Sequence, residues 1–255
     1  MNFLLILIKT LFFTFLCFIC FYNKAQTTQT EVIYFPTVKN KSVKELQTKT
    51  GEFEYEFLMT DKSKWKARLF IPNIKEEQKI PLVIALHWAG NKNVYKEFAT
   101  CLAFPAFDSK NVIIVAPSSE GKMWTDEPIE IRLIRLVKQL KKYLPIDEDK
   151  IMIMGYSNGG IASWQFALKY PKLFSVALPM AAIYSSKKIT IPVYALHGKN
   201  DELFDVENSE KSLLESISKG SKIEYKIIEN LSHYMACNYL EELKKMIDSI
   251  NKEVF

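Results

Sequence analysis

Apolar and charged residues alternate in two adjacent segments on either side of residue 60. In Phe53–Phe57 and in Trp65–Ile71, apolar side chains recur at every second position. This period of two is typical of strands that bury one face. The polar sequence Asp61-Lys62-Ser63 joins the two segments, so we expect a turn there and an antiparallel pair of strands.

Further along the chain, continuous apolar runs and helical patterns follow one another. Apolar runs predict strands buried on both faces of a sheet, whereas apolar residues at helical spacing predict helices with one buried face. We expect strands at 80–86, 112–115, 151–154, 175–180, 189–196 and 223–228, and helices at 94–109 with a break near Pro105, 129–140, 161–170, 209–218 and 235–254. This alternation predicts an α/β fold with a mostly parallel central sheet and helices on both faces.

The connection after the expected strand at 175–180 is short. Only residues 184–188 separate it from the next expected strand, and a helical lid does not fit into so few residues. We therefore expect no lid domain. A site on this fold would be open to solvent and accessible to large or polymer-attached substrates.

The N-terminal residues form a separate apolar segment. Residues 3–22 are apolar apart from one lysine and two threonines, and Ala25 offers a small residue for cleavage soon afterwards. We interpret residues 1–25 as a secretory signal peptide, which predicts a secreted or periplasmic protein. The run of about 20 residues is also long enough to span a bilayer, so an uncleaved membrane anchor is the alternative.

Residues 26–50 are polar and show no clear period. We expect a linker or a loosely attached N-terminal arm, with one short strand at Val32–Phe35. The chain has 255 residues, of which 48% are hydrophobic, and that is enough for one large, well-buried domain. Residues 51–255 are therefore assigned to a single α/β domain.

Charge and cysteine content narrow the possible partners and bonds. The formal net charge is +5, but the basic residues are spread along the chain, so we predict no nucleic-acid partner. Only Cys101 and Cys237 lie outside residues 1–25. In an exported protein such a pair could form a disulfide, but we favour two free, buried thiols.

A glycine-rich motif joins the expected strand at 151–154 to the expected helix at 161–170. It reads Gly155-Tyr156-Ser157-Asn158-Gly159-Gly160, and G-x-S-x-G between a strand and a helix predicts a nucleophile elbow with Ser157 at its tip. The glycines leave room where the backbone turns sharply, and a positive φ costs glycine little. A Gly/Ser turn without chemistry is the alternative interpretation.

Two further residues complete a candidate catalytic triad. His233 and Asp201 lie in the loops after the last two expected strands, at the edge where open α/β sheets bind ligands. A neutral imidazole at His233 can take the Ser157 proton, and Asp201 can accept a hydrogen bond from the other ring nitrogen. Asp205 is the nearest alternative acid. The order serine, acid, histidine is that of one hydrolase fold.

Acyl transfer also needs two N–H groups that stabilise an oxyanion. We expect one from the backbone of Asn158, directly after the nucleophile, and one from the turn that follows the strand at 80–86. In that turn Ala89 is favoured over Trp88. His87, in the same turn, and His197 are interpreted as structural groups that brace their loops.

Four aromatic residues are candidates to line a binding platform for an aromatic acid or a sugar. For two of them, Trp124 and Tyr156, packing in the core is the alternative interpretation. The histidines and remaining cysteines lack the spacing of metal ligands, and the chain has no Gly-rich phosphate loop, so we expect no metal or cofactor. The four candidates are Trp88, Trp124, Tyr156 and Tyr234, and the alternative applies to Trp124 and Tyr156.

From about Phe53 to Ile250 the chain resembles the α/β-hydrolase fold superfamily, and within it the lidless esterases. These include feruloyl and acetylxylan esterases and polyhydroxybutyrate depolymerase-like enzymes. The resemblance rests on the elbow motif, on His197-Gly198-Lys199-Asn200-Asp201, on Ser232-His233 and on Trp124 before the helix that precedes the elbow.

The resemblance implies a secreted serine esterase that cleaves carboxylic esters through an acyl-enzyme. Its substrates would be small-molecule or polymer-attached esters, among them carbohydrate-linked acyl or hydroxycinnamoyl esters. Such families usually have His-Gly in the oxyanion turn, whereas here Trp88 follows His87. The alternatives are a serine peptidase or lyase on the same fold, and a catalytically silent hydrolase fold used for binding.

Overall fold

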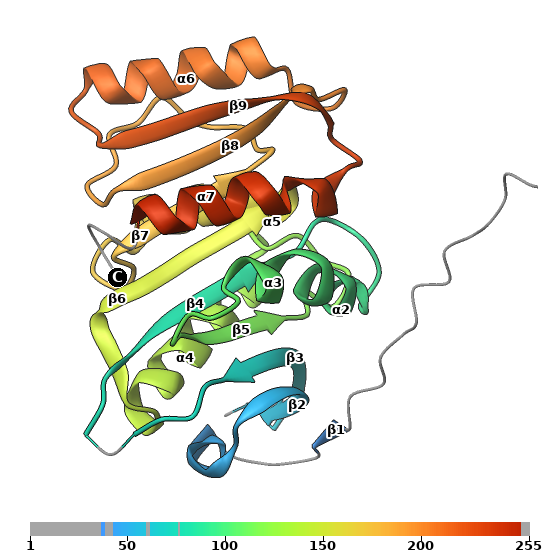
Figure 1. Cartoon of the computed structure of the whole chain (residues 1–255), viewed down its shortest axis with the longest axis vertical. Helices are drawn as coiled ribbons and strands as arrows, with labels where there is room; N and C mark the ends of the chain where they lie inside the picture. The colour runs from blue at the N-terminus through green and yellow to red at the C-terminus, as the bar shows by residue number, and fades with distance from the viewer. Residues whose placement is uncertain (1–36, 39–42, 60–61, 76, 251–255) are drawn as a thin grey trace, which may run out of the picture. The chain divides into compact units, whose positions relative to one another are not determined.

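The computed structural model describes residues 37–38, 43–59, 62–75 and 77–250. In this part of the chain one nine-stranded sheet has the order β1-β2-β3-β5-β4-β6-β7-β8-β9 (Figure 1). The predicted signal segment 1–25 and the predicted strand Val32–Phe35 lie outside the described residues. The strands are β1 Thr37–Val38, β2 Gly51–Leu58, β3 Lys64–Ile71, β4 Ile80–Leu86, β5 Ile113–Pro117, β6 Ile146–Tyr156, β7 Val176–Met180, β8 Val193–Asn200 and β9 Ile223–Ser232.

The sheet is mostly parallel. β4 pairs in parallel with β5 and with β6, and parallel pairing continues through β7, β8 and β9. At the other edge β2 and β3 are antiparallel, with Phe53 opposite Leu69, and β3 is antiparallel to β5. The expected parallel sheet and the expected antiparallel pair are both confirmed.

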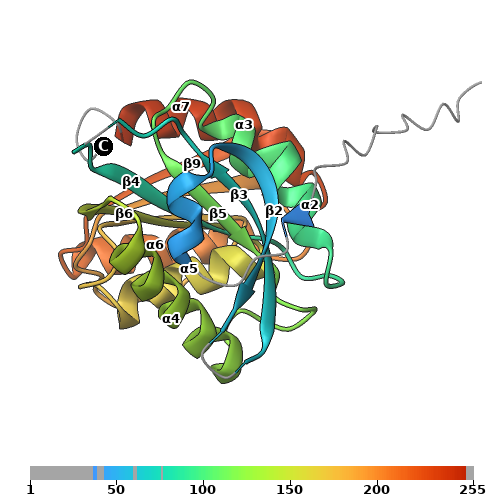
Figure 2. The ribbon, with the colours of Figure 1, turned by 90° about the horizontal axis from the view of Figure 1, so that it is seen from below.

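Helices cover both faces of this sheet (Figure 2). Buried residues of α4, α5 and α6 belong to one apolar cluster, and those of α2, η2, α3 and α7 belong to a second cluster. The elements are α2 Val94–Phe98, the π-helical turn η2 Ala99–Ala103, α3 Phe104–Ala106, α4 Glu127–Tyr143, α5 Asn158–Lys169, α6 Val206–Ser218, the 3-10 turn η3 Ala236–Tyr239 and α7 Leu240–Ile250.

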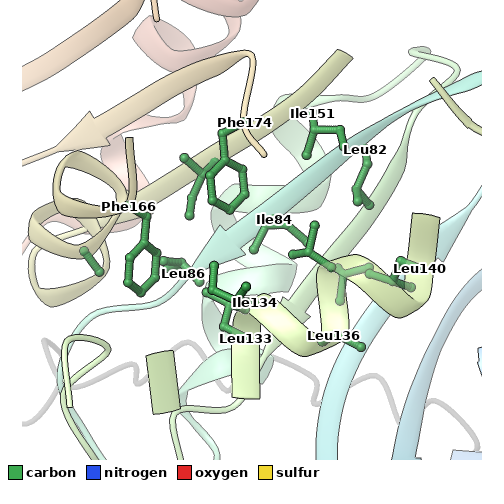
Figure 3. Packing of buried hydrophobic residues seen from close by; sticks show 14 of the residues in the cluster. Leu82, Ile84, Leu86, Leu133, Ile134, Leu136, Leu140, Ile151, Phe166 and Phe174 are labelled. Atoms are coloured by element: carbon green, nitrogen blue, oxygen red, sulfur yellow. The ribbon is translucent and has the colours of Figure 1, made fainter. Parts of the chain in front are cut away.

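Successive residues of β4 belong to the two clusters in turn. Leu82, Ile84 and Leu86 pack in the cluster of α4 and α5 (Figure 3), whereas Val83 and Ala85 pack in the other. Side chains alternate across a strand, so a strand between two helical layers needs apolar residues at every position. This explains why unbroken apolar runs predicted the central strands.

Several element boundaries differ from the expectation, and two of the differences involve prolines. Pro105 lies in the first turn of α3, where its missing N–H is tolerated, and the segment before it is the π-helical turn η2 rather than a break at the proline. The strand expected at 189–196 is β8, which begins only at Val193, directly after Pro192. Its end reaches Asn200, next to the candidate acid Asp201.

The segment before residue 51 is not wholly the loose arm that we expected. Val43–Thr48 forms a 3-10 helix, η1, in which Val43 and Leu46 are buried. Gln47 Nε2 donates a hydrogen bond to the carbonyl of Tyr143 at the end of α4. Apolar residues spaced three apart share a face of a 3-10 helix, and they anchor this segment to the core. The domain therefore begins before residue 51.

Cys101 and Cys237 form a disulfide, so the expectation of two free thiols is wrong. Their Cα atoms are 5.4 Å apart although 136 residues separate them in sequence. The bond joins η2 to η3, which both pack in the cluster on one face of the sheet. Sequence separation gave no indication of this contact because only the strand order brings the two turns together.

No lid is inserted after the elbow helix. Residues 181–192, which connect β7 to β8, contain no helix or strand. The absence of a lid domain agrees with the expected fold class. Among the helices of the described residues, none is both long enough and apolar enough to cross a membrane.

Candidate active site

Ser157 lies at a sharp turn between β6 and α5. Its backbone has φ 55° and ψ −117°, a conformation that costs a side-chain-bearing residue free energy and is common at functional turns. Its N–H donates to the carbonyl of Met180 at 3.0 Å, and its carbonyl accepts from Ile161 N–H at 2.8 Å. The helix begins at Asn158, three residues before the expected start.

The glycines of the elbow are required by close backbone approach. A Cβ atom at Gly159 would lie 1.9 Å from the carbonyl oxygen of Leu86, and one at Gly160 would lie 2.4 Å from that of Met180. A Cβ at Gly155 would lie 2.3 Å from the backbone of Gly159. None of the three has a positive φ, so that part of the expectation is wrong. The positive φ is at Ser157 itself.

Ser157, His233 and Asp201 form a continuous chain of hydrogen bonds. His233 Nε2 lies 2.8 Å from Ser157 Oγ, and His233 Nδ1 lies 2.8 Å from Asp201 Oδ2. Each residue directly follows a parallel strand, namely β6, β9 and β8. The carboxyl ends of these strands meet at one edge of the sheet, which is why residues 32 to 76 positions apart are in contact.

The Asp201 carboxylate is buried and has several hydrogen-bond donors. Its side chain is 0% exposed, and Oδ2 also lies 3.1 Å from His197 Nε2. Oδ1 accepts from the N–H groups of Leu203 and Phe204 at 2.9 and 2.7 Å. Burial opposes ionisation, but hydrogen bonds from His197, His233 and the Phe204 backbone outweigh it and hold the pKa of Asp201 well below its usual range. Asp201 is therefore ionised at neutral pH.

Asp205, the alternative acid, lies outside this chain of hydrogen bonds. It is the N-cap of α6, and its Oδ1 accepts from Asn208 N–H at 2.7 Å. Short acidic side chains are favoured at that position because they satisfy a free N–H of the first helical turn. The geometry thus assigns Asp205 a structural contact and brings Asp201 to His233.

His87 braces the turn after β4, as expected. Its Nδ1–H donates to the carbonyl of Trp88 at 2.5 Å, and its Nε2 accepts from Ser119 N–H at 2.9 Å. The ring is 0% exposed. Burial lowers the pKa of His87 to about 4, against a smaller opposing effect of the Trp88 carbonyl. A neutral imidazole is what this pattern of one donor and one acceptor nitrogen requires.

A pocket of about 390 Å³ opens beside the nucleophile. Three of the four predicted platform residues, Trp88, Tyr156 and Tyr234, line it together with Ala89 from the oxyanion turn. Trp124 does not. The full lining is Trp88, Ala89, Glu97, Tyr156, Ser157, Leu203, His233, Tyr234, Met235, Ala236, Cys237 and Asn238.

The assignment of Trp124 to the binding platform is therefore wrong. Its side chain is 0% exposed, and its Nε1–H donates to the carbonyl of His87 at 2.9 Å. Its backbone N–H lies 3.4 Å from Asn158 Oδ1. A buried tryptophan needs a partner for its indole N–H, and here that partner belongs to the oxyanion turn. Trp124 is a supporting residue under the site.

The oxyanion hole remains a prediction. Asn158 is the first residue of α5, and the first four N–H groups of a helix have no partner within it. Ala89 is exposed in the turn after β4 and lines the pocket. Both residues are thus near Ser157 with backbone N–H groups of the kind required.

Sequence reasoning missed Glu202, which directly follows Asp201. Its Oε2 accepts a hydrogen bond from the backbone N–H of His233 at 2.9 Å. From the other side, Tyr156 Oη–H donates to the carbonyl of His233 at 2.9 Å. The main chain of His233 is thus held by two side chains. An acidic residue in a loop carries no motif, so the sequence offered no signal for this contact.

A larger cavity of about 710 Å³ lies elsewhere, between α5 and residues 183–188. It is lined by none of the predicted site residues. Within the described residues no group of three His, Cys, Asp or Glu side chains is arranged to hold a metal ion. Beside the smaller pocket, the side chains of Ser157, His233 and Asp201 are in hydrogen-bond contact.

Comparisons with known proteins give one family-model match. Residues 127–251 match a family model described as phospholipase/carboxylesterase. No curated protein matches the chain.

Solved structures share the fold. A thermostable esterase is 23% identical with a TM-score of 0.67, over 79% of this chain and 62% of its own. The Staphylococcus aureus fluorophosphonate-binding serine hydrolase FphF is 10% identical with a TM-score of 0.64, over 77% and 98%. The S-formylglutathione hydrolase from Agrobacterium tumefaciens is 13% identical with a TM-score of 0.63, over 82% and 98%. The chain has the α/β-hydrolase fold, as the resemblance implied.

Replacement of Glu202 tests whether its hydrogen bond to the His233 N–H contributes to activity. Glu202→Ala removes the acceptor of the His233 N–H, and we expect kcat for an ester to fall about 10-fold with little change in KM, since losing one such hydrogen bond costs about 1–2 kcal/mol. Glu202→Gln retains an acceptor oxygen and should recover most of the loss. Glu207→Ala, on α6, is the matched control. An unchanged kcat in Glu202→Ala would show that the contact is dispensable.

Burial of neutral His87 makes stability depend on pH. The unfolded chain takes up a proton near pH 6.5, whereas folded His87 does so only near pH 4. The contribution of neutral His87 to the free energy of unfolding is therefore fully present above pH 6.5. It is lost as the pH falls toward 4, by up to about 3 kcal/mol. Urea unfolding should show the stability gap between wild type and His87→Gln shrinking between pH 7 and pH 4. A constant gap would contradict this assignment.

Proposed function

We propose that this chain of the α/β-hydrolase fold is a serine hydrolase that cleaves carboxylic esters. The observation that carries the proposal is the uninterrupted chain of two 2.8 Å hydrogen bonds from Ser157 through His233 to Asp201. The match of residues 127–251 to a phospholipase/carboxylesterase family supports ester hydrolysis. The position of Ser157 and His233 in the wall of an open pocket gives the ester carbonyl access to both.

In the proposed mechanism Ser157 Oγ attacks the ester carbonyl while His233 Nε2 takes its proton. The resulting imidazolium is stabilised by Asp201, which also fixes the proton on Nδ1. His233 then gives its proton to the leaving alcohol, and an acyl-enzyme forms. Water then attacks the acyl carbon and loses a proton to His233; the bond from the acyl carbon to Ser157 Oγ breaks, the acid leaves, and Oγ takes the proton back from Nε2. Every proton passes through Nε2, so the 2.8 Å contact with Ser157 is central.

The tetrahedral intermediates carry a negative oxygen that needs N–H donors. We assign this role to the backbone N–H groups of Asn158 and Ala89. The Asn158 N–H lies at the N-terminus of α5, where the helix dipole favours negative charge. Trp88, the neighbouring alternative, also lines the pocket.

The open site favours esters attached to large or polymeric alcohols. The pocket has about 390 Å³, enough for an acyl group of moderate size, and Trp88, Tyr156 and Tyr234 give it aromatic walls. Carbohydrate-linked acyl and hydroxycinnamoyl esters fit these properties, as the resemblance to feruloyl and acetylxylan esterases implies. A panel of acetyl, butyryl, feruloyl and longer acyl esters would rank them.

Ser157→Ala should abolish the activity. We expect wild type to release p-nitrophenol from short acyl esters and to react with a fluorophosphonate probe, and the variant to do neither, because the nucleophile is gone. Losing triad function costs many orders of magnitude in rate. Peptide amides assayed in parallel separate an esterase from a peptidase. Equal ester hydrolysis by wild type and variant would contradict the proposal and leave a binding role.

We also propose that the protein is exported, with residues 1–25 as the signal peptide. Disulfides persist in oxidising compartments, so the Cys101–Cys237 bond supports this location. When the full chain is expressed in a host with a secretory pathway, the protein should be recovered outside the cytoplasm. Mass spectrometry should show a mature N-terminus near Gln26 and no free thiols. A full-length chain in the membrane fraction would favour the uncleaved anchor, and a reduced cytoplasmic chain would contradict export.

A further inference from the structure

The charged groups around the catalytic pocket are unevenly distributed. Among the residues that line it, Glu97 of α2 is the one with a permanently charged side chain at neutral pH, and no lysine or arginine lines it. Glu97 is exposed, and among the described residues it forms no ion pair. The pocket that receives the substrate therefore contains an uncompensated negative charge.

Two basic residues close in sequence to lining residues of the pocket have partners elsewhere. Lys96, beside Glu97 on α2, lies 2.7 Å from the carboxylate of Glu54 on β2. Lys199, at the end of β8, pairs with Glu229 at 2.8 Å. Neither lysine lines the pocket. The formal net charge of the whole chain is +5, whereas the one acidic residue of the pocket lining has no basic counterpart in that lining.

Aromatic residues in the pocket lining also attract cations. Trp88, Tyr156 and Tyr234 line the same pocket as Glu97, and Tyr234 is 74% exposed, which leaves its ring accessible. Aromatic rings attract ammonium groups through the negative charge above their faces, by about 0.5–1 kcal/mol at exposed sites. Tyr156 is only 1% exposed, so the groups that can attract an alkylammonium ion from solvent are the Glu97 carboxylate and the rings of Trp88 and Tyr234.

We propose that the pocket selects esters that carry a cationic group near the reacting carbonyl, that it disfavours anionic ones, and that Glu97 determines this preference. The inference rests on the proposed ester hydrolysis and names the substrate class for the same site. An ammonium on the substrate is attracted to Glu97 and to the aromatic walls. A carboxylate in the same place is repelled by Glu97, and no lining lysine or arginine compensates for that repulsion.

The preference can be measured with acetate esters matched in shape. The probes are 2-(trimethylammonio)ethyl acetate, its neutral isostere 3,3-dimethylbutyl acetate, and 3-acetoxypropanoate as the anion. At low ionic strength we expect wild-type kcat/KM to favour the cation over the isostere by about 5-fold and the isostere over the anion by a similar factor. Salt should reduce both ratios, because it screens the interaction with Glu97.

Glu97→Gln keeps the size of the side chain and removes its charge. We expect it to bring the ratio of cation to isostere to within about 2-fold of unity. Glu215→Gln, an exposed helical glutamate of α6 outside the pocket, should leave both ratios as in wild type. Glu97→Gln should keep a small preference for the cation over the isostere. Tyr234→Phe, added to Glu97→Gln, should retain this remainder, whereas Tyr234→Leu, added in the same way, should lower it.

Two results would overturn this inference while leaving the proposed function intact. One is a wild-type enzyme that hydrolyses the cationic, neutral and anionic esters equally well. The other is a preference for the cation that is the same in Glu97→Gln as in wild type. Failure of the neutral isostere to react with wild type at all would instead count against ester hydrolysis.

Discussion

The backbone of the elbow approaches the ends of two neighbouring strands so closely that side chains are excluded there. Gly159 lies against the last residue of β4, and Gly160 against the last residue of β7, with carbonyl oxygens where Cβ atoms would be. This contact inserts the start of α5 between two strands of the central sheet. Ser157, the residue directly before α5, has the positive φ, so it lies at the end of β6 and the first N–H groups of α5 follow it.

Near Ser157, the buried Asp201 carboxylate is the common acceptor for the surrounding polar groups. Asp201 receives hydrogen bonds from two histidines and two backbone N–H groups. A buried charge is costly unless its hydrogen bonds are made, and here each oxygen has two donors. The loop after β8 supplies the two backbone N–H groups, and His197, a residue within β8, lies 3.1 Å from Asp201 Oδ2 through its Nε2. The orientation of His233 therefore depends on all the hydrogen bonds that hold Asp201 in place, and not on the Asp201–His233 bond alone.

The wall of the pocket is built from the segment that follows His233. Glu202 and Tyr156 hold the His233 main chain from both sides, and four residues later Cys237 is bonded to Cys101 of η2. Cys237 also lines the pocket. The same short stretch thus carries His233, contributes to the pocket lining and is attached to the helical layer on one face of the sheet. In the proposed function, substrate binding and proton transfer would depend on this one segment.

Much of this architecture follows from local sequence. Unbroken apolar runs predict central strands because two helical layers bury both faces, and the glycines of the elbow predict the turn because nothing larger fits. Since parallel strands end at one edge, Ser157, Asp201 and His233 could be grouped from their positions after strands. Tertiary structure alone decided the rest. Trp124 is buried under the oxyanion turn, Leu46 anchors a segment without a clear sequence period, and Cys101 meets Cys237 across 136 residues. Each of these depends on which elements become neighbours, and that is set by the order of strands in the sheet, which no local pattern encodes.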